Sequence, residues 1–164
     1  TSKYTLFESS AASDVYKRQG HIGLTPQTAS ALGGFKMQGR DAAAAHQIID
    51  DAKALEDAGV FSMILEAVPA PLGKLVAEAV KVPVIGIGAG PDVDGQVLVT
   101  HDMVGLFDKF VPKFVKQYTR IRPIILEALG EYKKEVQEGV FPGPEHSFKM
   151  PAEALTQLKK MIEK

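Results

Sequence analysis

The sequence predicts a parallel α/β fold, and two observations support that prediction. Short apolar runs alternate along the chain with stretches whose apolar residues recur at helical spacing, and the runs are apolar almost throughout. A strand that is apolar on both sides is typical of a parallel sheet, because such a sheet is buried on both faces. The alternation of strand and helix indicates the same pairing, since a helix returns the chain to the start of the next parallel strand.

Two amphipathic helices are predicted in the middle of the chain. The first spans 41–58 and is followed by Gly59 as a stop signal. Its apolar face contains Ala45, Ile48, Ile49, Ala52 and Leu55. The second spans 72–80 and is expected to face inward through Leu72, Leu75, Val76, Ala79 and Val80.

Four strands are expected around these helices. One spans 60–68 and ends at prolines, and one spans 82–87 and leads into a glycine loop. A third is placed at 96–103, and a fourth should end at 20–23. We expect the strands that end at His21, Glu66, Gly88 and Asp102 to lie side by side and parallel, with those ends on one rim.

The sequence after Gly105 is predicted to be mainly helical. Helices are expected at 110–118, 123–139 and 151–164, the last of them amphipathic, and 139–148 is expected to be a loop.

The composition is that of a compact domain with a real core, with 164 residues of which 45% are hydrophobic. The formal net charge of −1 and the absence of a long apolar run favour neither nucleic acid nor a membrane as a partner. The chain has no cysteine, which excludes a thiolate nucleophile and is consistent with the cytoplasm.

Glu66 is the most informative candidate for chemistry. It lies inside the apolar run MILEAV near the end of a predicted strand. A buried carboxylate is costly unless it is paired or protonated, and the carboxyl ends of parallel strands are where active sites collect. Glu66 is therefore either a proton acceptor or a structural carboxylate. His21, at another strand end, is a second candidate, although a lone histidine is more often structural.

Other polar and glycine-rich positions favour structural roles. His101 and Asp102 end the third predicted strand, where a helix cap or simple packing is the alternative to function, and His46 and His146 are interpreted as structural or solvated. In the segment 86–90, GIGAG, Gly86 and Gly88 match the first two glycines of a dinucleotide fingerprint, but Pro91 occupies the position of the third. The segment is therefore an anion- or substrate-facing turn or, preferably, a site of close packing. The basic loop 33–40 could contact an anionic substrate, but an ordinary surface loop is favoured. No metal-ligand spacing occurs among the strand ends.

Residues 1–19 lack the periodicity of the rest of the chain. The stretch 9–19, SSAASDVYKRQ, resembles the translation of a DNA adaptor used in transposase-based sequencing libraries. We therefore expect residues 1–19 to be foreign to the fold, with Val15 and Tyr16 not packed against the strands. Residues 20–164 then form the domain, and coding sequence is expected to have been lost upstream of Gly20.

Six motifs follow one another along the chain. They are HIGLTPQ at 21–27, GGFKMQGR at 33–40, LEAVP at 65–69, VIGIGAG at 84–90, DGQVLVTHD at 94–102 and FPGPEHSF at 141–148. In this order they resemble one family, the ketopantoate hydroxymethyltransferases, over roughly Gly20 to Phe148. The first four resemble that family's fifth, sixth and seventh strand ends, and the last two its later segments.

The resemblance implies the second half of a (β/α)8 TIM barrel, about four βα units with extra C-terminal helices. It implies transfer of a hydroxymethyl group from 5,10-methylenetetrahydrofolate to 3-methyl-2-oxobutanoate, giving 2-dehydropantoate for pantothenate synthesis. Glu66 would be the general base that takes the C3 proton, and His21 would contact the oxo acid. A homo-oligomer in the cytoplasm is implied for the full-length enzyme.

The resemblance also implies a magnesium ion whose ligands, two aspartates and a glutamate, lie on earlier strands and not in residues 20–164. A complete barrel needs about 250 residues, so we expect this chain alone to be inactive. Two other interpretations stay open. One is a magnesium-dependent 2-oxo-acid C–C lyase of the isocitrate lyase and phosphoenolpyruvate mutase type, whose members usually need a cysteine loop that this chain lacks. The other is a non-catalytic half-barrel module, which has no need of a carboxylate in an apolar strand.

Overall fold

The computed structural model describes residues 18–26 and 36–162. Val15 and Tyr16, for which no packing was expected, lie outside the described residues, as do positions 33–35 of the basic loop. The chain divides into two compact units, residues 1–118 and 119–164. The first unit contains the sheet, and the second contains only helices and loops among its described residues.

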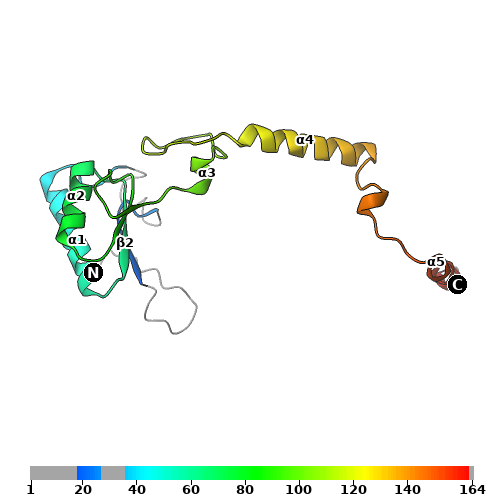
Figure 1. Cartoon of the computed structure of the whole chain (residues 1–164), viewed down its shortest axis with the longest axis horizontal. Coiled ribbons are helices and arrows are strands. Elements are labelled where there is room, and N and C mark those ends of the chain that lie inside the picture. The colour runs from blue at the N-terminus through cyan, green and yellow to red at the C-terminus, as the bar shows by residue number, and fades with distance from the viewer. Residues whose placement is uncertain (1–17, 27–35, 163–164) are drawn as a thin grey trace. The chain divides into compact units, whose positions relative to one another are not determined.

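The described residues form a four-stranded parallel sheet (Figure 1). Its strands, in spatial and chain order, are β1 (Gln19–Gly23), β2 (Ser62–Glu66), β3 (Val84–Ile87) and β4 (Gly95–Gln96). The expectation that residues 1–19 stand apart from the fold is wrong at Gln19, which begins β1, pairs with Ser62 and donates a hydrogen bond to its hydroxyl at 3.0 Å. Glu66 pairs with Gly23 on one side and with Ile87 on the other. The first three strands therefore end together on one rim, as predicted, and the arrangement is that expected for half of a (β/α)8 barrel.

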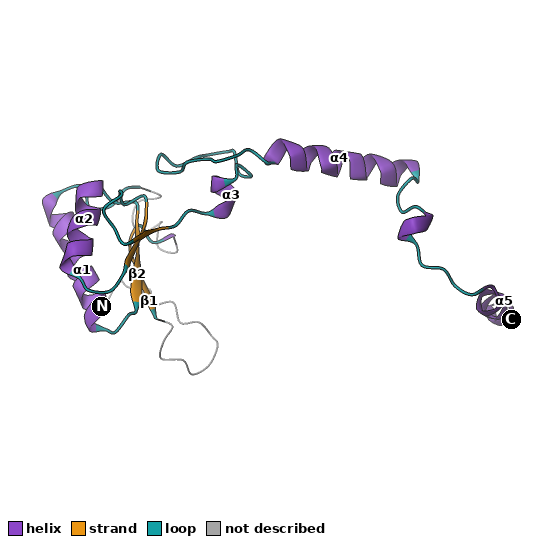
Figure 2. Ribbon diagram, viewed as in Figure 1, coloured by secondary structure: helices purple, strands orange, loops and turns teal. Residues whose placement is uncertain are grey.

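Helices α1 (Ala42–Asp57) and α2 (Ala70–Ala79) lie together on one side of this sheet (Figure 2). Helix α1 begins where Asp41 accepts a hydrogen bond from the Ala44 N–H at 2.8 Å, because a side-chain acceptor satisfies a free amide of the first turn. Helix α1 packs against β1 and α2 against β3. The two helices thus fill the connections between successive parallel strands.

The hydrophobic core lies between the two helices and the sheet. Met63 and Leu65 of β2 are fully buried there, whereas Ile64 and Glu66 point to the opposite face and are only half-buried. The largest fully buried side chains are Met63, Leu65, Val76 and Val84. Burial of each such side chain stabilises the fold by about 1.5–3 kcal/mol. The predicted inner face of α1 is confirmed, since Ile48, Ala52 and Leu55 are buried.

The predicted inner face of α2 is wrong at Leu75, which is 52% exposed. The buried residues of α2 are Leu72, Gly73 and Val76. Gly73 lies on the inner face, and only a residue without a side chain fits there, because a Cβ would collide with the carbonyl oxygen of Ala89. Close approach of the α2 backbone to the loop after β3 turns the helix so that Leu75 faces outward.

The third predicted strand, 96–103, is also wrong in its extent. Pairing with β3 is limited to Gly95–Gln96, and the last ladder hydrogen bond runs from the Val97 N–H to the Gly86 carbonyl at 3.0 Å. The strand stops because β3 itself ends at Ile87 and turns away at Gly88, so no partner is left for residues beyond Val97. His101 and Asp102 lie instead on the one-turn helix α3 (Thr100–Met103).

Residues 110–118 form a loop and not the predicted helix. Pro112 interrupts the segment, because the ring of a proline disfavours the helical conformation at the preceding residue, here Val111. The Tyr118 N–H donates to the Met103 carbonyl at 2.9 Å, which ties the end of this loop back to α3. The aromatic side chains of the segment are therefore presented by a loop.

The second unit contains helix α4 (Arg122–Glu138), a short 3₁₀ helix η2 (Pro144–His146) and helix α5 (Ala152–Ile162). The predicted helices are confirmed, and the predicted loop at 139–148 contains η2. Gly139 ends α4 with a φ of 71°, a left-handed conformation that glycine adopts readily. Neither α4 nor α5 has a buried residue. No helix in the described part of the chain is long and apolar enough to cross a membrane.

Candidate active site

The side chains of His21 and Glu66 meet at the rim of the sheet. Their Nε2 and Oε2 atoms are 3.0 Å apart, and each side chain is only 14% exposed. A carboxylate this far removed from water needs a hydrogen-bond partner, and the imidazole supplies one. An ionised carboxylate can only accept, so Nε2 of His21 donates to Oε2 when Glu66 is charged.

The register of β1 and β2 explains why these two side chains meet. His21 pairs with Ile64 in the ladder, and Glu66 lies two residues further along β2. Positions two apart on a strand point to the same face, so His21, Ile64 and Glu66 share the face opposite to α1 and α2. The contact is therefore a diagonal one across neighbouring strands.

The backbone at the end of β2 is held in an unusual conformation. Ala67 has a φ of 50°, a value that costs an L-residue about 1–2 kcal/mol. Its N–H donates to the Ile87 carbonyl, and its carbonyl accepts from the Gln38 N–H, both at 2.9 Å. These bonds on both sides of Ala67 hold the chain in this turn directly after Glu66.

Gly23 holds the other side of the same turn. Its φ is 80°, and a Cβ there would collide with the carbonyl oxygen of Glu66. The same carbonyl accepts a hydrogen bond from the Leu24 N–H at 2.9 Å. The backbone of Glu66 is thus fixed from β1 as well as from β3.

Glu66 opens onto a cavity of about 810 Å³, within the size range of small-molecule sites. Apolar side chains and backbone form most of its wall, and Lys36, Lys113 and Glu66 are its charged members. The remaining lining residues are Leu24, Met37, Ala67, Val68, Pro69, Ala70, Gly88, Gly90, Phe107, Phe110, Pro112 and Phe114. Two ammonium groups against one carboxylate favour an anionic ligand.

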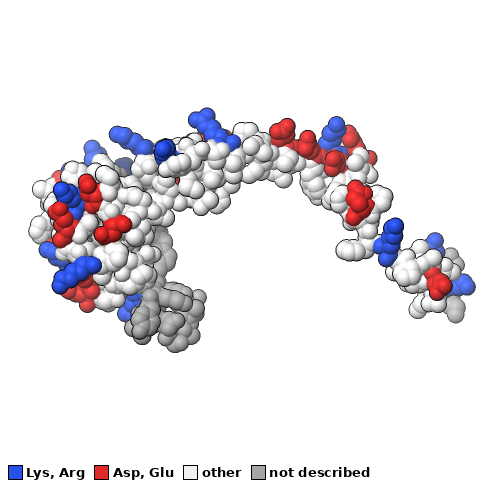
Figure 3. Space-filling view, viewed as in Figure 1, with Lys and Arg blue, Asp and Glu red and all other residues white. Residues whose placement is uncertain are grey.

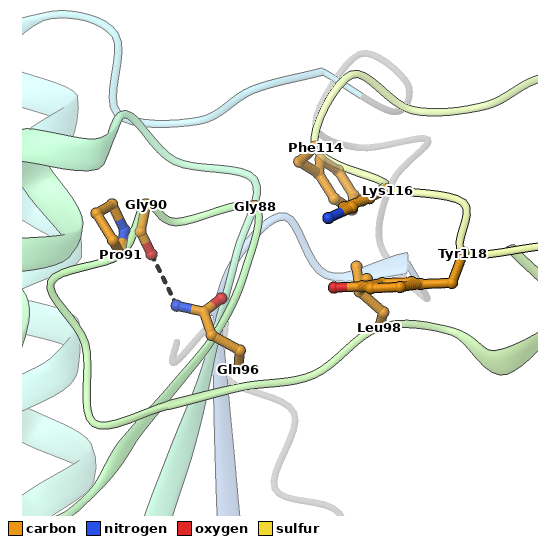
Figure 4. A pocket seen from close by; sticks show the side chains of 8 residues that line it. All are labelled: Gly88, Gly90, Pro91, Gln96, Leu98, Phe114, Lys116 and Tyr118. Atoms are coloured by element: carbon orange, nitrogen blue, oxygen red, sulfur yellow. Dashed lines mark hydrogen bonds between the residues drawn. The ribbon is translucent and has the colours of Figure 1, made fainter. Parts of the chain in front are cut away.

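A second cavity of about 480 Å³ shares Gly88, Gly90 and Phe114 with the first. Its lining residues, shown in Figure 4, are Gly88, Gly90, Pro91, Gln96, Leu98, Phe114, Lys116 and Tyr118. The side-chain amide of Gln96 donates to the Gly90 carbonyl at 2.9 Å and supports the glycine loop. The Phe114 ring packs directly on Gly88, where a Cβ would be 2.6 Å from the ring.

The charge distribution supports the preference for anions. Basic side chains are seen along the segment that follows α3, where the sequence has Lys109, Lys113 and Lys116 (Figure 3). Elsewhere on the visible face of the first unit both signs of charge are mixed (Figure 3).

Within the described residues, no group of three or more histidine, cysteine, aspartate or glutamate side chains could hold a metal ion. The described part of this site thus does not fit a magnesium ion by itself.

Sequence comparison identifies the family. The profile of the ketopantoate hydroxymethyltransferase family matches residues 17–144, more than half of the chain. The chain belongs to this family. A curated 3-methyl-2-oxobutanoate hydroxymethyltransferase from Heliobacterium modesticaldum is 58% identical over 134 residues, which are 82% of this chain and 49% of that protein. One from Syntrophobacter fumaroxidans is 58% identical over 132 residues, 80% of this chain and 47% of the relative.

The chain spans about half the length of these curated hydroxymethyltransferases. The match begins two residues before β1, so the whole described sheet lies inside the family's region. Residues after 144, which include α5, lie beyond the match to the family profile.

Of the candidates predicted from sequence, the structure of this family member brings His21 and Glu66 together and leaves the other histidines apart. His101 and Asp102 are on α3 and line neither cavity. His46 is 75% exposed and lies 3.0 Å from Asp50, one turn away on α1. His146 is also exposed and contacts the backbone N–H of Gly143.

Sequence reasoning missed several residues of the cavities. Lys36 and Met37 line the larger one, although an ordinary surface loop was favoured for their segment. Phe107, Phe110 and Phe114 were missed because the segment around them was predicted to be a helix with a mixed surface. The phenylalanines themselves recur at helical spacing, so the signal that could have found the loop is Pro112, because the residue before a proline is biased away from the helical conformation.

Proposed function

We propose that this chain contributes the base-bearing part of an enzyme that transfers a hydroxymethyl group from 5,10-methylenetetrahydrofolate to 3-methyl-2-oxobutanoate. The product would be 2-dehydropantoate. The single observation that supports this best is the half-buried His21–Glu66 pair, at the carboxyl end of a parallel sheet and beside a cavity with two lysines. Membership of the hydroxymethyltransferase family supports the choice of reaction over a lyase or a scaffold.

In this proposal Glu66 removes a proton from C3 of the oxo acid. Its Oε2 is occupied by His21, so Oε1 is the oxygen that takes the proton. Water releases the one-carbon unit from the two folate nitrogens as formaldehyde and leaves tetrahydrofolate. The enolate then forms a carbon–carbon bond to the formaldehyde carbon, and the resulting alkoxide takes back the proton held by Glu66. The apolar wall of the cavity keeps bulk water from the enolate, which would otherwise be reprotonated.

His21 has two tasks in the proposed reaction. Its Nε2–H orients the Glu66 carboxylate, and the ring contacts the bound oxo acid from β1. Lys36 and Lys113 are the cations of the cavity, and we assign them the attraction of the substrate carboxylate. Glu66, Lys36 and Lys113 line the same cavity, and His21 is hydrogen-bonded to Glu66.

Three further properties are proposed on the family resemblance. Magnesium would serve the reaction, with ligands outside the described residues, and none of the steps assigned to Glu66 and His21 passes through it. A homo-oligomeric state is supported by the exposed apolar residues of α4 and α5, such as Leu129 and Met161. Location in the cytoplasm rests on the resemblance alone and is tested by cell fractionation.

A chimera provides the decisive experiment. The preceding half of the Heliobacterium modesticaldum relative would be joined to residues 20–164 of this chain, because 58% identity favours matching contacts across the junction. Exchange of the C3 proton of 3-methyl-2-oxobutanoate would be followed by NMR in deuterated solvent with magnesium. Glu66→Gln keeps the size of the side chain and removes its basicity, so exchange should fall by ~10² to 10⁴.

Glu78→Gln is the matched control, because this glutamate is 61% exposed on α2 and lines neither cavity. It should leave the exchange rate unchanged. Parental exchange by the Glu66→Gln chimera would show that Glu66 is not the base. No product from the parental chimera, at normal oxo-acid binding, would contradict the proposed transfer.

A further inference from the structure

Ala67 is the one non-glycine residue with a positive φ in the described part of the chain, and it directly follows Glu66. This left-handed conformation is strained for a residue with a side chain, whereas glycine adopts it freely. Such strain persists only where the surrounding structure fixes it, and it is found most often at functional sites. Here the hydrogen bonds of the Ala67 N–H and carbonyl, to Ile87 and Gln38, fix it. The conformation therefore calls for a physical reason.

The left-handed residue reverses the alternation of side chains at the end of β2. Met63 and Leu65 face the core. In an uninterrupted strand Ala67 would follow them into the core, and Val68 would lie on the face of Glu66. The structure has the opposite arrangement. Val68 borders the cavity but is 3% exposed and belongs to the core cluster of Met63 and Leu65, whereas Ala67 lies outside that cluster and lines the Glu66 cavity.

This reversal leaves room for a ligand beside the carboxylate. An extended Ala67 would place the isopropyl group of Val68 two positions after Glu66 on the same face, in the space that a substrate must occupy. The left-handed conformation puts a methyl group at the cavity wall instead, and this methyl packs with Leu24. A methyl group also restricts the backbone more than a hydrogen does, so the chain after Glu66 is held more narrowly than glycine would hold it.

We propose that Ala67 is the positioning residue of this active site. Its left-handed backbone removes Val68 from the face of Glu66 and sets the direction in which the carboxylate enters the cavity. This inference rests on the proposed function, which makes Glu66 the base. Proton transfer needs the base within hydrogen-bonding reach of its proton, and a small misplacement of a reacting group lowers the rate strongly. A change at Ala67 should therefore lower turnover and spare the affinity for the oxo acid.

The test compares two substitutions of similar size and polarity in the chimera. Ala67→Thr introduces a β-branched residue, for which a positive φ is a severe outlier, whereas asparagine tolerates a positive φ best after glycine. Proton exchange at C3, per folded molecule, should fall about 10²-fold in Ala67→Thr and no more than about tenfold in Ala67→Asn. The Kd of the oxo acid should change by less than about threefold in both. Ala67→Gly keeps the conformation and loses only its restriction, so exchange should fall by about threefold.

A second readout uses the 164-residue chain and does not depend on the reaction. The NMR shift of the His21 Nε2 nitrogen reports its 3.0 Å contact with Glu66. Ala67→Thr should move this signal toward its position in Glu66→Gln, whereas Ala67→Gly should leave it in place. Ala43→Thr is the matched control, because it makes the same substitution at an exposed position of α1. It should change neither the signal nor, in the chimera, the exchange rate.

Two results would overturn the inference. One is an equal exchange rate in Ala67→Thr and the parental chimera. The other is a loss in Ala67→Gly as large as that in Ala67→Thr, which would assign the effect to the methyl group and not to the backbone. If Ala67→Thr does not fold, losses above about tenfold in both Ala67→Gly and Ala67→Asn overturn it, because both residues adopt the conformation. Parental exchange by Glu66→Gln, with the expected Nε2 signals, would contradict the proposed reaction and not the positioning of the carboxylate.

Discussion

Helices α1 and α5 are both amphipathic, yet their surroundings differ completely. Helix α1 buries Ile48, Ala52 and Leu55 against the sheet, whereas α5 has no buried residue and leaves Leu158 44% exposed. The difference extends to the two units, because every buried hydrophobic residue of the described chain lies at or before Ala89. The apolar face of a helix indicates that it is suited to packing, but burial also needs a partner surface.

The two faces of the sheet in the first unit differ in a similar way. In the first unit, the helix-facing side of the sheet is closed by α1 and α2, and the opposite face carries His21 and Glu66 beside a cavity. Stability and function are thus assigned to opposite faces of the same strands. Substitutions on the first face should change unfolding, and substitutions on the second should change binding and chemistry.

The largest expected effect on stability compares one leucine from each unit. Leu65→Ala removes a side chain that is 0% exposed in β2 and should cost about 2–5 kcal/mol of unfolding free energy. Leu158→Ala in α5 should change it by no more than about 0.5 kcal/mol, because the side chain is already exposed. Urea unfolding of the full chain, followed by circular dichroism, measures both. Equal losses in the two variants would contradict the exposure of Leu158 and the contrast between the two helices.

Two glycines allow backbone strain to be separated from contact. Gly59→Ala places a side chain at a φ of 82° with nothing within 4 Å, so only the left-handed conformation is penalised, by about 1–2 kcal/mol. Gly23→Ala has a similar φ of 80° but also collides with the Glu66 carbonyl oxygen, so its cost should be larger. Thermal unfolding ranks the two variants. A smaller loss for Gly23→Ala would show that β1 does not hold the end of β2.

The N-terminus of α1 should show an intermediate effect. Asp41→Ala removes the acceptor of the 2.8 Å bond from the Ala44 N–H and should cost about 1 kcal/mol. Asp41→Asn is the control, because asparagine caps helices nearly as well. Chemical denaturation of both variants checks this, and an equal loss in both would assign the effect to charge instead of capping.

The smallest effect is expected on the outer face of α2. Lys74 and Glu78 are 3.9 Å apart and more than half exposed, so Glu78→Gln should change stability by less than about 0.5 kcal/mol. The measurement is the unfolding free energy of Glu78→Gln, and in parallel of Lys74→Gln, with and without added salt. Added salt should not change the difference from the parental chain. A loss above 1 kcal/mol would disqualify this variant as a control for Glu66→Gln.

Much of the first unit could be predicted because its signals are local. The apolar runs around Ile64 and Ile85, and the spacing of Ile48, Ala52 and Leu55, predicted two strands and a helix that the structure confirms. Glu66 was singled out by the cost of a carboxylate in an apolar strand, which depends only on neighbouring residues. The roles of Glu66 as base and of His21 as substrate contact stay predictions.

The errors occurred where a distant backbone decided the outcome. Leu75 faces outward because Gly73 lets α2 approach Ala89, and residues beyond Val97 are not in a strand because β3 has turned away. Neither contact is visible in the local pattern. The loop around Pro112 could have been predicted from the proline, because the residue before a proline is biased away from the helical conformation.

The sequence by itself determined the alternation of strands and helices, their parallel pairing and the choice of Glu66, because hydrophobic periodicity and buried charge act over a few residues. Only the tertiary structure decided that His21 is the partner of Glu66, since the two are 45 positions apart and meet through the strand register. It also decided that Lys36, Phe114 and Lys116 border cavities at that rim. Register and loop placement depend on the summed packing of remote segments, so no short stretch of sequence contains them.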